Sequence, residues 1–187
     1  MANRVLLLAS GSGTLARAIF QAHKADELSI DIVGLISDKQ APVLDIAKSY
    51  DLPTFFIPMT SDRVSWNTEI FQRAQSLTPD LIVSVGFMRL LAPEFVQKFK
   101  VINTHPSLLP LYPGATAVRD ALATGASVTG TTVHWVDAGL DTGPVIAQHE
   151  IEILAGDDEA TLHERIKIAE RALIVETLAK YGRTGSL

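Results

Sequence analysis

The stretch Val5-Leu6-Leu7-Leu8-Ala9 constrains the fold most, because five successive residues are apolar. A strand that faces water on one side alternates apolar and polar residues, whereas a strand covered on both faces of a parallel sheet is apolar throughout. The later run Leu81-Ile82-Val83-Ser84-Val85 is nearly as apolar. These two runs predict buried strands of a parallel sheet.

Helical patterns alternate with strand patterns through the first hundred residues. Strands are predicted at 5–9, 30–37, 54–57, 80–85 and 101–102, and helices at 15–22, 42–49, 63–77 and 93–98. Such alternation is typical of an open sheet whose strands are joined by right-handed crossover helices. We therefore predict the α/β class, with an open, Rossmann-like, mainly parallel twisted sheet flanked by helices.

The remainder of the chain departs from this alternation. A helix at 116–124 is followed by two strand-like segments, 128–136 and 144–153. The loop between these segments is too short for a crossover helix, so we predict an antiparallel C-terminal strand pair.

A long last helix completes the predicted fold. Its apolar residues from Leu162 to Leu173 recur at helical spacing, and Asp157 or Asp158 is expected to cap its N-terminus. Residues 181–187 are expected to form a frayed tail.

Length and composition favour a single domain that spans 1–187. The net charge of −5 argues against nucleic acid as a partner, and the absence of cysteine excludes disulfides, thiolate zinc sites and a cysteine nucleophile. No stretch approaches the ~20 apolar residues of a membrane span. We expect a cytoplasmic protein without a membrane partner.

The segment Lys100 to Pro110 brings two reactive side chains to one strand end. In an extended backbone Asn103 and His105 point to the same side, about 7 Å apart at a rise of roughly 3.3 Å per residue. A histidine can shuttle a proton, an asparagine amide can donate to a developing oxyanion, and an acid such as Asp141 can orient the imidazole. With no nucleophilic serine or cysteine identified beside them, direct attack by a substrate amine on an acyl group fits better than a covalent intermediate.

Structural roles for these residues stay open at this stage. A histidine in a strand is often a hydrogen-bonded structural residue, and an aspartate in a glycine-rich loop often stabilises a turn. His134 likewise is either a supporting residue of the site or a buried, hydrogen-bonded histidine.

The turn Ser10-Gly11-Ser12-Gly13-Thr14 lies between the first strand and the first helix. Such a turn places free backbone N–H groups and the positive end of the helix where a phosphate can bind. A plain tight turn is the alternative. The spacing Gly11-x-Gly13-x-x-Ala16, with Asp38 at the end of the second strand, also permits a nicotinamide-dependent oxidoreductase. That class leaves the polar residues at 103, 105 and 141 unexplained.

Several motifs together resemble the folate-dependent formyltransferases. The most specific is Asn103-Thr104-His105-Pro106-Ser107-Leu108-Leu109-Pro110, with Gly86-Phe87-Met88-Arg89 before it and Leu140-Asp141-Thr142-Gly143-Pro144 after it. Ser10-Gly11-Ser12-Gly13 and Tyr112-Pro113-Gly114 are similar to the branch of this family that acts on 5′-phosphoribosylglycinamide. The resemblance covers nearly the whole chain, in order.

The resemblance implies a reaction and three catalytic residues. The formyl group of the co-substrate 10-formyltetrahydrofolate would pass to the amine of 5′-phosphoribosylglycinamide in de novo purine biosynthesis, through a tetrahedral intermediate and without a metal. Asn103 would polarise the formyl oxygen, His105 would stabilise the intermediate and assist proton transfer, and Asp141 would hold His105. The implied partners are small molecules, and a homodimer is an open alternative to a monomer.

The resemblance also implies two binding regions and a cis Leu109–Pro110 bond. Residues 1–100 would form a phosphate- and ribonucleotide-binding half, and residues 101–187 a catalytic and folate-binding half. The ribonucleotide would contact Gly11, Ser12, Gly13, Thr14 and Glu170. The folate would contact Arg63, Met88, Arg89, Leu90, Leu91, Val136, Asp137 and Leu140.

Two departures from the family pattern limit what can be carried over. Many relatives have Gly-Asn-Gly-Ser-Asn at the first turn, so side-chain contacts from Ser12 or Leu15 are not inferred, and 115–118 lacks the histidines that some relatives have. Methionyl-tRNA formyltransferase, a sugar-nucleotide formyltransferase, a formyltetrahydrofolate hydrolase and an inactive folate-binding protein are the related alternatives. A tRNA-modifying enzyme would be expected to carry an additional basic domain.

Overall fold

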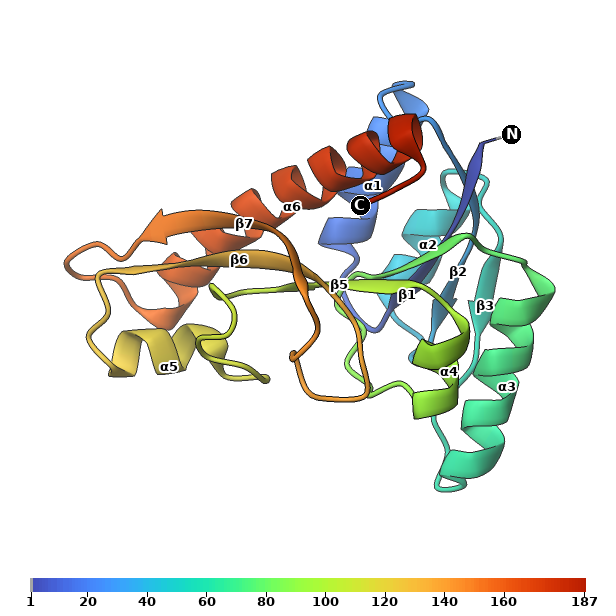
Figure 1. Cartoon of the computed structure of the whole chain (residues 1–187), viewed down its shortest axis with the longest axis horizontal. Helices are drawn as coiled ribbons and strands as arrows, with labels where there is room; N and C mark the ends of the chain where they lie inside the picture. Colours follow the sequence, from blue (N-terminus) through green and yellow to red (C-terminus); the bar gives the residue numbers. More distant parts are fainter. Residues whose placement is uncertain (1) are drawn as a thin grey trace.

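The computed structural model describes residues 2–187 and contains a seven-stranded sheet with helices on both faces (Figure 1). The strands are β1 (Asn3–Ala9), β2 (Ile30–Ser37), β3 (Thr54–Phe56), β4 (Leu81–Ser84), β5 (Val101–His105), β6 (Val128–Trp135) and β7 (Val145–Glu152). The helices are α1 (Thr14–Lys24), α2 (Pro42–Lys48), α3 (Arg63–Ser76), α4 (Pro93–Lys98), α5 (Ala117–Ala123) and α6 (Glu159–Thr184).

The strand order β3-β2-β1-β4-β5-β6-β7 confirms the predicted fold class. Strands β1 to β5 pair in parallel, whereas β6 is antiparallel to both of its neighbours, β5 and β7. The sheet grows from β1 toward β3 and then, after a crossover, from β4 in the other direction. Ligands of open α/β sheets bind beyond the carboxyl ends of the strands at such a reversal.

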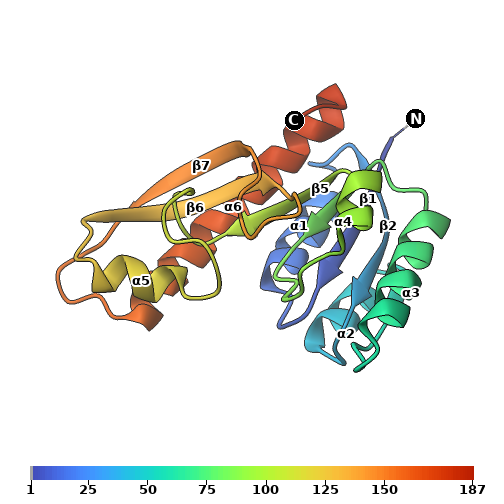
Figure 2. The same cartoon turned by 60° about the horizontal axis from the view of Figure 1, so that its bottom comes forward.

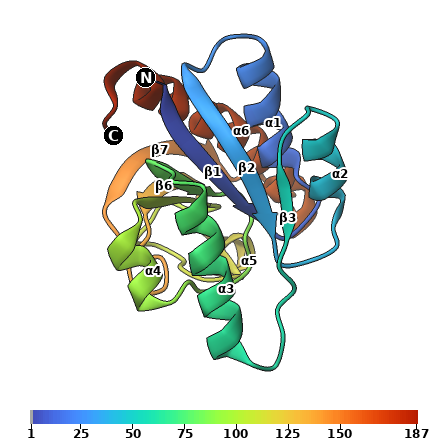
Figure 3. The same ribbon diagram turned by 90° about the vertical axis from the view of Figure 1, so that its right-hand side faces the viewer.

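The alternating faces of β1 explain why that strand is wholly apolar. Val5 and Leu7 pack in a cluster with α1, α2 and α6, whereas Leu6 and Leu8 pack in a second cluster with α3 and α4. All four side chains are fully buried. Figure 3 shows α1 and α2 on one side of the β1–β2–β3 ribbon and α3 on the other. Both faces therefore exclude water, as the sequence pattern predicted.

The helix α6 begins at a capping box and lies beside α5 (Figure 2). The Asp158 carboxylate accepts a hydrogen bond from Thr161 N, so Asp158 rather than Asp157 is the N-cap. Val118 of α5 packs with Leu162 and Ile166 in a third apolar cluster.

The expectation that residues 181–187 fray is wrong for residues 181–184. The helix α6 continues to Thr184, and Gly185 ends it with a left-handed φ of 71°. Tyr181 is buried in the cluster that also contains Leu178, and its carbonyl accepts a hydrogen bond from the Asn3 side chain at 3.1 Å. Tertiary packing, which local sequence pattern does not report, extends the helix.

None of the helices within residues 2–187 is both long enough and apolar enough to cross a membrane.

The packing of the last helical turns predicts a cost for Tyr181→Ala. Removing this buried ring should lower the free energy of unfolding by about 3 kcal/mol, because a cavity replaces its contacts. Urea denaturation followed by circular dichroism measures the change, with the exposed neighbour Lys180→Ala as the control. Equal midpoints for the two variants would show that this end of α6 is frayed after all.

Candidate active site

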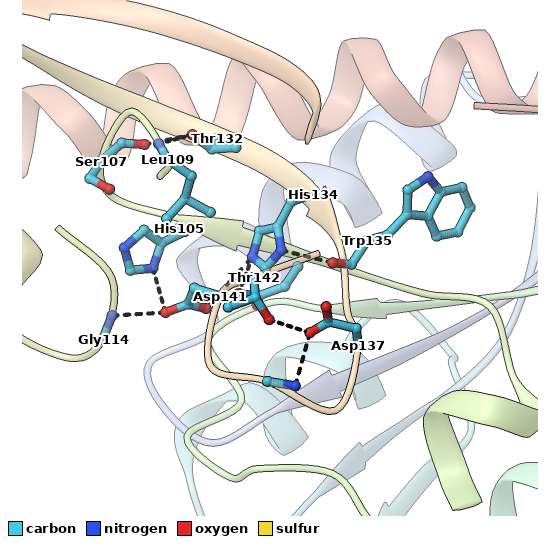
Figure 4. Close-up of polar contacts among 12 residues, drawn as sticks. His105, Ser107, Leu109, Gly114, Thr132, His134, Trp135, Asp137, Asp141 and Thr142 are labelled. Carbon is cyan, nitrogen blue, oxygen red and sulfur yellow. Dashed lines mark hydrogen bonds and ion pairs between the residues drawn. The ribbon is translucent and has the colours of Figure 1, made fainter. Parts of the chain in front are cut away.

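The end of β5 is extended by its pairing with β6. The apolar pattern predicted a strand over Val101 and Ile102 only, but β5 continues to His105. Asn103 lies opposite His134, and His105 lies opposite Thr132. Because opposed residues of an antiparallel pair share a face, this register brings His134 into the same site as Asn103 and His105. Figure 4 shows His134 and His105 on either side of Asp141.

Both ring nitrogens of His105 have partners in the fold. Its Nε2 donates to the Tyr112 carbonyl at 2.8 Å, and its Nδ1 lies 3.4 Å from Asp141 Oδ2. A carbonyl only accepts, so Nε2 carries a proton in this arrangement. The Asp141 contact is then attractive when Nδ1 is protonated too. Asp141 is therefore placed to stabilise His105 in its charged form.

His134 is held in one tautomer by its neighbours. Its Nδ1 donates to the Trp135 carbonyl at 2.9 Å, and its Nε2 lies 3.3 Å from Asn103 Nδ2. Burial lowers the pKa of His134, although the Trp135 hydrogen bond and the Asp141 charge oppose the shift. The neutral ring accepts from the Asn103 amide, which orients that amide and leaves its second N–H for another acceptor.

Asp141 joins two loops to the strand end. Its Oδ2 accepts from Gly114 N at 2.8 Å, and its Oδ1 lies 3.7 Å from His134 Nε2. The loop that carries Asp141 closes tightly, since a Cβ at Gly143 would lie 1.8 Å from the Trp135 carbonyl oxygen. Asp141 thus contacts both histidines of the site, as Figure 4 shows.

The second acid of this loop has a structural role. Asp137 Oδ1 accepts from Thr142 Oγ1 at 2.7 Å and from Gly139 N at 2.9 Å. The Thr142 hydrogen bond lowers the pKa of Asp137 and keeps the carboxylate charged. Asp137 therefore shapes the loop on which Asp141 stands.

The segment that follows His105, residues 107–111, is anchored by buried hydroxyl groups and contains the implied cis bond. The Leu109–Pro110 peptide is cis. Thr132 Oγ1 accepts from Leu109 N at 3.1 Å and donates to the Ser107 carbonyl at 2.6 Å. Ser107 Oγ in turn donates to the Leu111 carbonyl at 2.6 Å.

The glycine-rich turn connects β1 to α1 with exposed backbone. Gly13 is the N-cap of α1, has φ of 76°, and no side chain caps the first turn. A Cβ at Gly13 would lie 2.7 Å from Val43 Cγ2, so glycine is required there. Gly11, Ser12 and Thr14 are exposed. The first N–H groups of α1 are therefore left without a side-chain cap, at a turn whose other residues are exposed.

One cation beside this turn was missed by sequence reasoning. Arg17 lines a surface groove together with Ser12 and Pro42. It stands one helical turn after Gly13, a spacing that a search for helical neighbours of the turn would have found.

The loop after β4 and the loop after β6 each contribute a side chain to one apolar cluster. Val136 and Leu91 both pack against the cluster that contains Phe87. Three apolar side chains of these loops stay exposed: Met88 at 67%, Leu90 at 63% and Leu140 at 54%. These exposed apolar side chains are candidates for a binding surface.

Both predicted arginines support the first of these loops. Arg89 Nε donates to Asp38 Oδ2 at 2.6 Å. The Arg63 guanidinium donates to the Leu90 carbonyl and lies 4.5 Å from the Trp66 ring. Neither side chain is simply solvated.

Glu170 lies on the buried face of α6, with 6% of its surface exposed. Among residues 2–187 its carboxylate makes no ion pair or hydrogen bond, and burial raises its pKa to about 7. A buried, unpaired carboxylate is costly, so a role beyond packing is indicated.

Fold and site together define an α/β transferase, and the chain belongs to the formyl transferase family, whose model matches residues 3–178. It is 44% identical over 186 residues to the phosphoribosylglycinamide formyltransferase of Mycobacterium tuberculosis, a match that covers 97% of this chain and 86% of that protein. The Bacillus subtilis protein of the same name is 38% identical over 165 residues, with 86% and 85% covered.

Solved structures agree with these relatives. Phosphoribosylglycinamide formyltransferase from Bacillus halodurans superposes with a TM-score of 0.92 at 36% identity, with 98% of this chain and 97% of that chain covered. Glycinamide ribonucleotide transformylase 1 from Symbiobacterium toebii superposes with a TM-score of 0.93 at 32% identity, and the match covers 97% of this chain and 88% of that chain. The family resemblance and the enzyme class predicted from the motifs are confirmed.

The environment of Glu170 predicts a pH-dependent stability. Its pKa is about 7 in the folded protein against an ordinary value of 4.5. The folded state therefore binds the proton more tightly, and this stabilisation, complete below pH 4.5, is lost as the pH rises toward 7. Glu170→Gln should match the parent at low pH and exceed its unfolding free energy at pH 8 by on the order of 3 kcal/mol.

Urea midpoints at several pH values measure this difference. Glu176→Gln, on the exposed side of the same helix, is the control and should follow the parent at every pH. Parallel profiles for all three proteins would mean that Glu170 is not titrating in this range.

Proposed function

We propose that this enzyme transfers the formyl group of 10-formyltetrahydrofolate to the amine of 5′-phosphoribosylglycinamide, a step of de novo purine biosynthesis. The observation that carries the proposal is the convergence of Asn103, His105 and Asp141 at the carboxyl end of β5. The names of the relatives support the acceptor, and the family supports a folate-derived formyl donor.

The proposed reaction is direct acyl transfer. The amine nitrogen forms a bond to the formyl carbon while the carbonyl π electrons move to oxygen, and the free N–H of Asn103 donates to that oxyanion. The amine nitrogen then loses one proton and N10 of the folate gains one. The carbonyl re-forms as the C–N10 bond breaks, which releases tetrahydrofolate and the formylated amide.

A covalent acyl-enzyme is disfavoured by the state of the Ser107 hydroxyl. Ser107 is fully buried, and its Oγ donates to the Leu111 and Tyr112 carbonyls. No base accepts its proton, which a serine nucleophile requires. The chain also lacks cysteine. Direct attack by the substrate amine is the simpler reaction.

Proton transfer by His105 requires an exchange of hydrogen-bond partner. Its Nε2 donates to the Tyr112 carbonyl, and Asp141 faces its Nδ1. We infer that the substrate takes the place of the Tyr112 carbonyl when His105 moves the proton. Asp141 would remain beside Nδ1 and stabilise the imidazolium.

We assign the ribonucleotide to the glycine-rich turn. The backbone N–H groups of Gly11, Ser12, Gly13 and Thr14 at this helix start suit a 5′-phosphate, and Arg17 adds a nearby positive charge in an acidic protein. Glu170 is assigned to the same substrate as an acceptor for its polar groups. Its lack of a partner within the described residues supports this role.

We assign the folate to the two loops that carry exposed apolar side chains. Met88, Leu90 and Leu140 offer the apolar surface that a flat ring system needs, and they fit such a ligand better than a polar one. Backbone groups of 88–91 and 136–140 would read the polar edge of the ring. Arg63 and Arg89 would contribute mainly by holding the first loop in place.

We also propose a single domain across 1–187 that acts in the cytoplasm on small molecules, as a monomer or a homodimer. The net charge of −5 supports small-molecule substrates over nucleic acid. The expected division at residue 100 holds only for the phosphate turn and the catalytic residues. Met88 is assigned to the folate but lies in the first half, and Glu170 is assigned to the ribonucleotide but lies in the second half.

An absorbance assay with 10-formyltetrahydrofolate, with and without the ribonucleotide, tests the function. We expect turnover only with both substrates. Asn103→Ala should lower kcat by about 10² to 10³, the usual effect of removing an oxyanion donor. His105→Ala and Asp141→Asn should each lower it by one or more orders of magnitude, whereas His149→Ala, an exposed histidine on β7, should not.

Two results would contradict the proposal. Donor consumption without the ribonucleotide would identify a hydrolase. Near-parental rates in Asp141→Asn would remove that residue from its role.

The phosphate assignment predicts a selective effect of Gly11→Ala. A Cβ at Gly11 meets no atom within 4 Å, so the variant should fold while the new methyl group narrows the open space at the turn. We expect the KM for the ribonucleotide to rise about tenfold, as for the loss of one charged hydrogen bond, with the donor KM unchanged. Ser12→Ala, which keeps the backbone, should leave both KM values unchanged. A phosphate-free substrate analogue that performs equally well would refute the assignment.

A further inference from the structure

The carboxylate of Asp38 lies fully buried between two loops of the site. Its side chain follows β2 and is 0% exposed. Ser10 Oγ donates to Oδ1 at 2.5 Å, and Arg89 Nε donates to Oδ2 at 2.6 Å. Both oxygens are thereby occupied by protein groups, so this acid is not free to bind a nucleotide ribose. The nicotinamide-dependent class that Asp38 permitted on sequence alone does not fit.

Ser10 extends this contact to the loop after β4. Its Oγ accepts from Met88 N at 2.9 Å, and its backbone N donates to the Gly86 carbonyl at 3.1 Å. One buried carboxylate therefore binds the loop twice: through Arg89 directly and through Ser10 to Met88. No other described carboxylate joins the carboxyl ends of β1, β2 and β4 in this way.

We propose that Asp38 is a positioning residue for the donor-binding loop, Gly86 to Leu91, and that it acts through Arg89 and Ser10. The inference rests on the proposed function in so far as this loop holds the formyl donor. Asp38 touches no reacting atom. Its role is to set the position of Met88 and its neighbours before the donor binds.

The need for such a residue follows from the loop's own composition. Residues 85–91 lie in no helix or strand. Phe87 and Leu91 pack in an apolar cluster, but Met88 and Leu90 between them are exposed and cannot be held in place by burial. The loop is held at its far end by the Arg63 guanidinium on the Leu90 carbonyl. At its near end the carboxylate of Asp38 supplies the charge-assisted contact, which is stronger than a neutral hydrogen bond.

The phosphate turn depends less on Asp38. Ser10 directly precedes that turn, but the turn has a second backbone contact, from Val43 N to the Gly11 carbonyl at 3.3 Å. Weakening Asp38 should therefore alter binding of the donor more than binding of the ribonucleotide.

The variant Asp38→Asn tests the charge while keeping the side-chain size. Its amide can still bond Ser10, but a neutral oxygen accepts more weakly from Arg89, and an N–H turned toward Arg89 would face another donor. The matched control is Asp31→Asn on the same strand. Asp31 forms an exposed ion pair with Arg4 at 3.2 Å, far along β2 from the site.

Steady-state kinetics supply the first measurement. In Asp38→Asn we expect the donor KM to rise about tenfold, with kcat and the ribonucleotide KM within about twofold of the parent. That pattern indicates lost binding rather than lost chemistry, and a generally damaged fold would lower kcat as well. Asp31→Asn should match the parent in all three constants.

Fluorescence supplies a second measurement that does not depend on activity. Trp66 stacks on Phe87 of the loop, with ring centroids 6.3 Å apart and planes 12° apart. Since the chain has two tryptophans, Trp135→Phe leaves Trp66 as the only reporter. In that background Asp38→Asn should make Trp66 more accessible to acrylamide, whereas Asp31→Asn should not.

The two measurements separate the possible failures. Unchanged quenching together with an unchanged donor KM in Asp38→Asn would overturn the positioning role. If Asp38→Asn increases quenching but the parent enzyme forms no formylated ribonucleotide, the positioning role of Asp38 is supported and the proposed function is refuted. If Asp38→Asn does not fold, Arg89→Met breaks the same ion pair at its partly exposed partner. This variant should then show the expected increase in acrylamide quenching of Trp66, and unchanged quenching would overturn the inference.

Discussion

The strand β5 has a parallel neighbour on one edge and an antiparallel neighbour on the other, and the site depends on this double pairing. Pairing with β4 places the end of β5 among the other carboxyl ends of the sheet, where open α/β folds bind ligands. Pairing with β6 sets which residues share the face of Asn103 and His105. A shift of one residue would turn His134 to the other side of the sheet and remove the contact that orients the Asn103 amide.

Around that strand end, most polar groups are positioned by other polar groups rather than by apolar packing. Asp141 holds His105 and the Gly114 backbone, Asp137 holds the loop that carries Asp141, and Asp38 holds the loop after β4. Each of these carboxylates has at least two partners, and for the fully buried Asp38 the bonds from Ser10 and Arg89 offset the cost of burial. Glu170 is buried without such partners among the described residues, and burial raises its pKa to about 7.

The predicted fold class was correct because apolar runs such as Val5 to Ala9 report burial on both faces directly. The predicted strand, which ended at Ile102, was too short. Asn103 and His105 are polar, and they are part of β5 because they pair with β6. The prediction of a frayed tail was wrong for residues 181–184 for a similar reason. Tyr181 is helical because it packs in the core near Leu178. In both cases the deciding interaction joins segments that are distant in the chain, and local composition contains no signal for it.

For the site, the sequence by itself determined which chemical groups are present: an amide and an imidazole two residues apart on one strand face, an acid in a glycine-rich loop, and a turn with free N–H groups. Periodicity and glycine spacing are local properties, so these could be read without coordinates. Only the tertiary structure decided that Asp141 reaches both histidines, that His134 faces Asn103, and that Asp38 is bonded to Ser10 and Arg89. Contacts of this kind join residues that are far apart in the chain. The separation ranges from seven positions, for His105 and Tyr112, to 78 positions, for Ser10 and Met88. Such contacts depend on sheet order and register, which the whole core sets and no short motif contains.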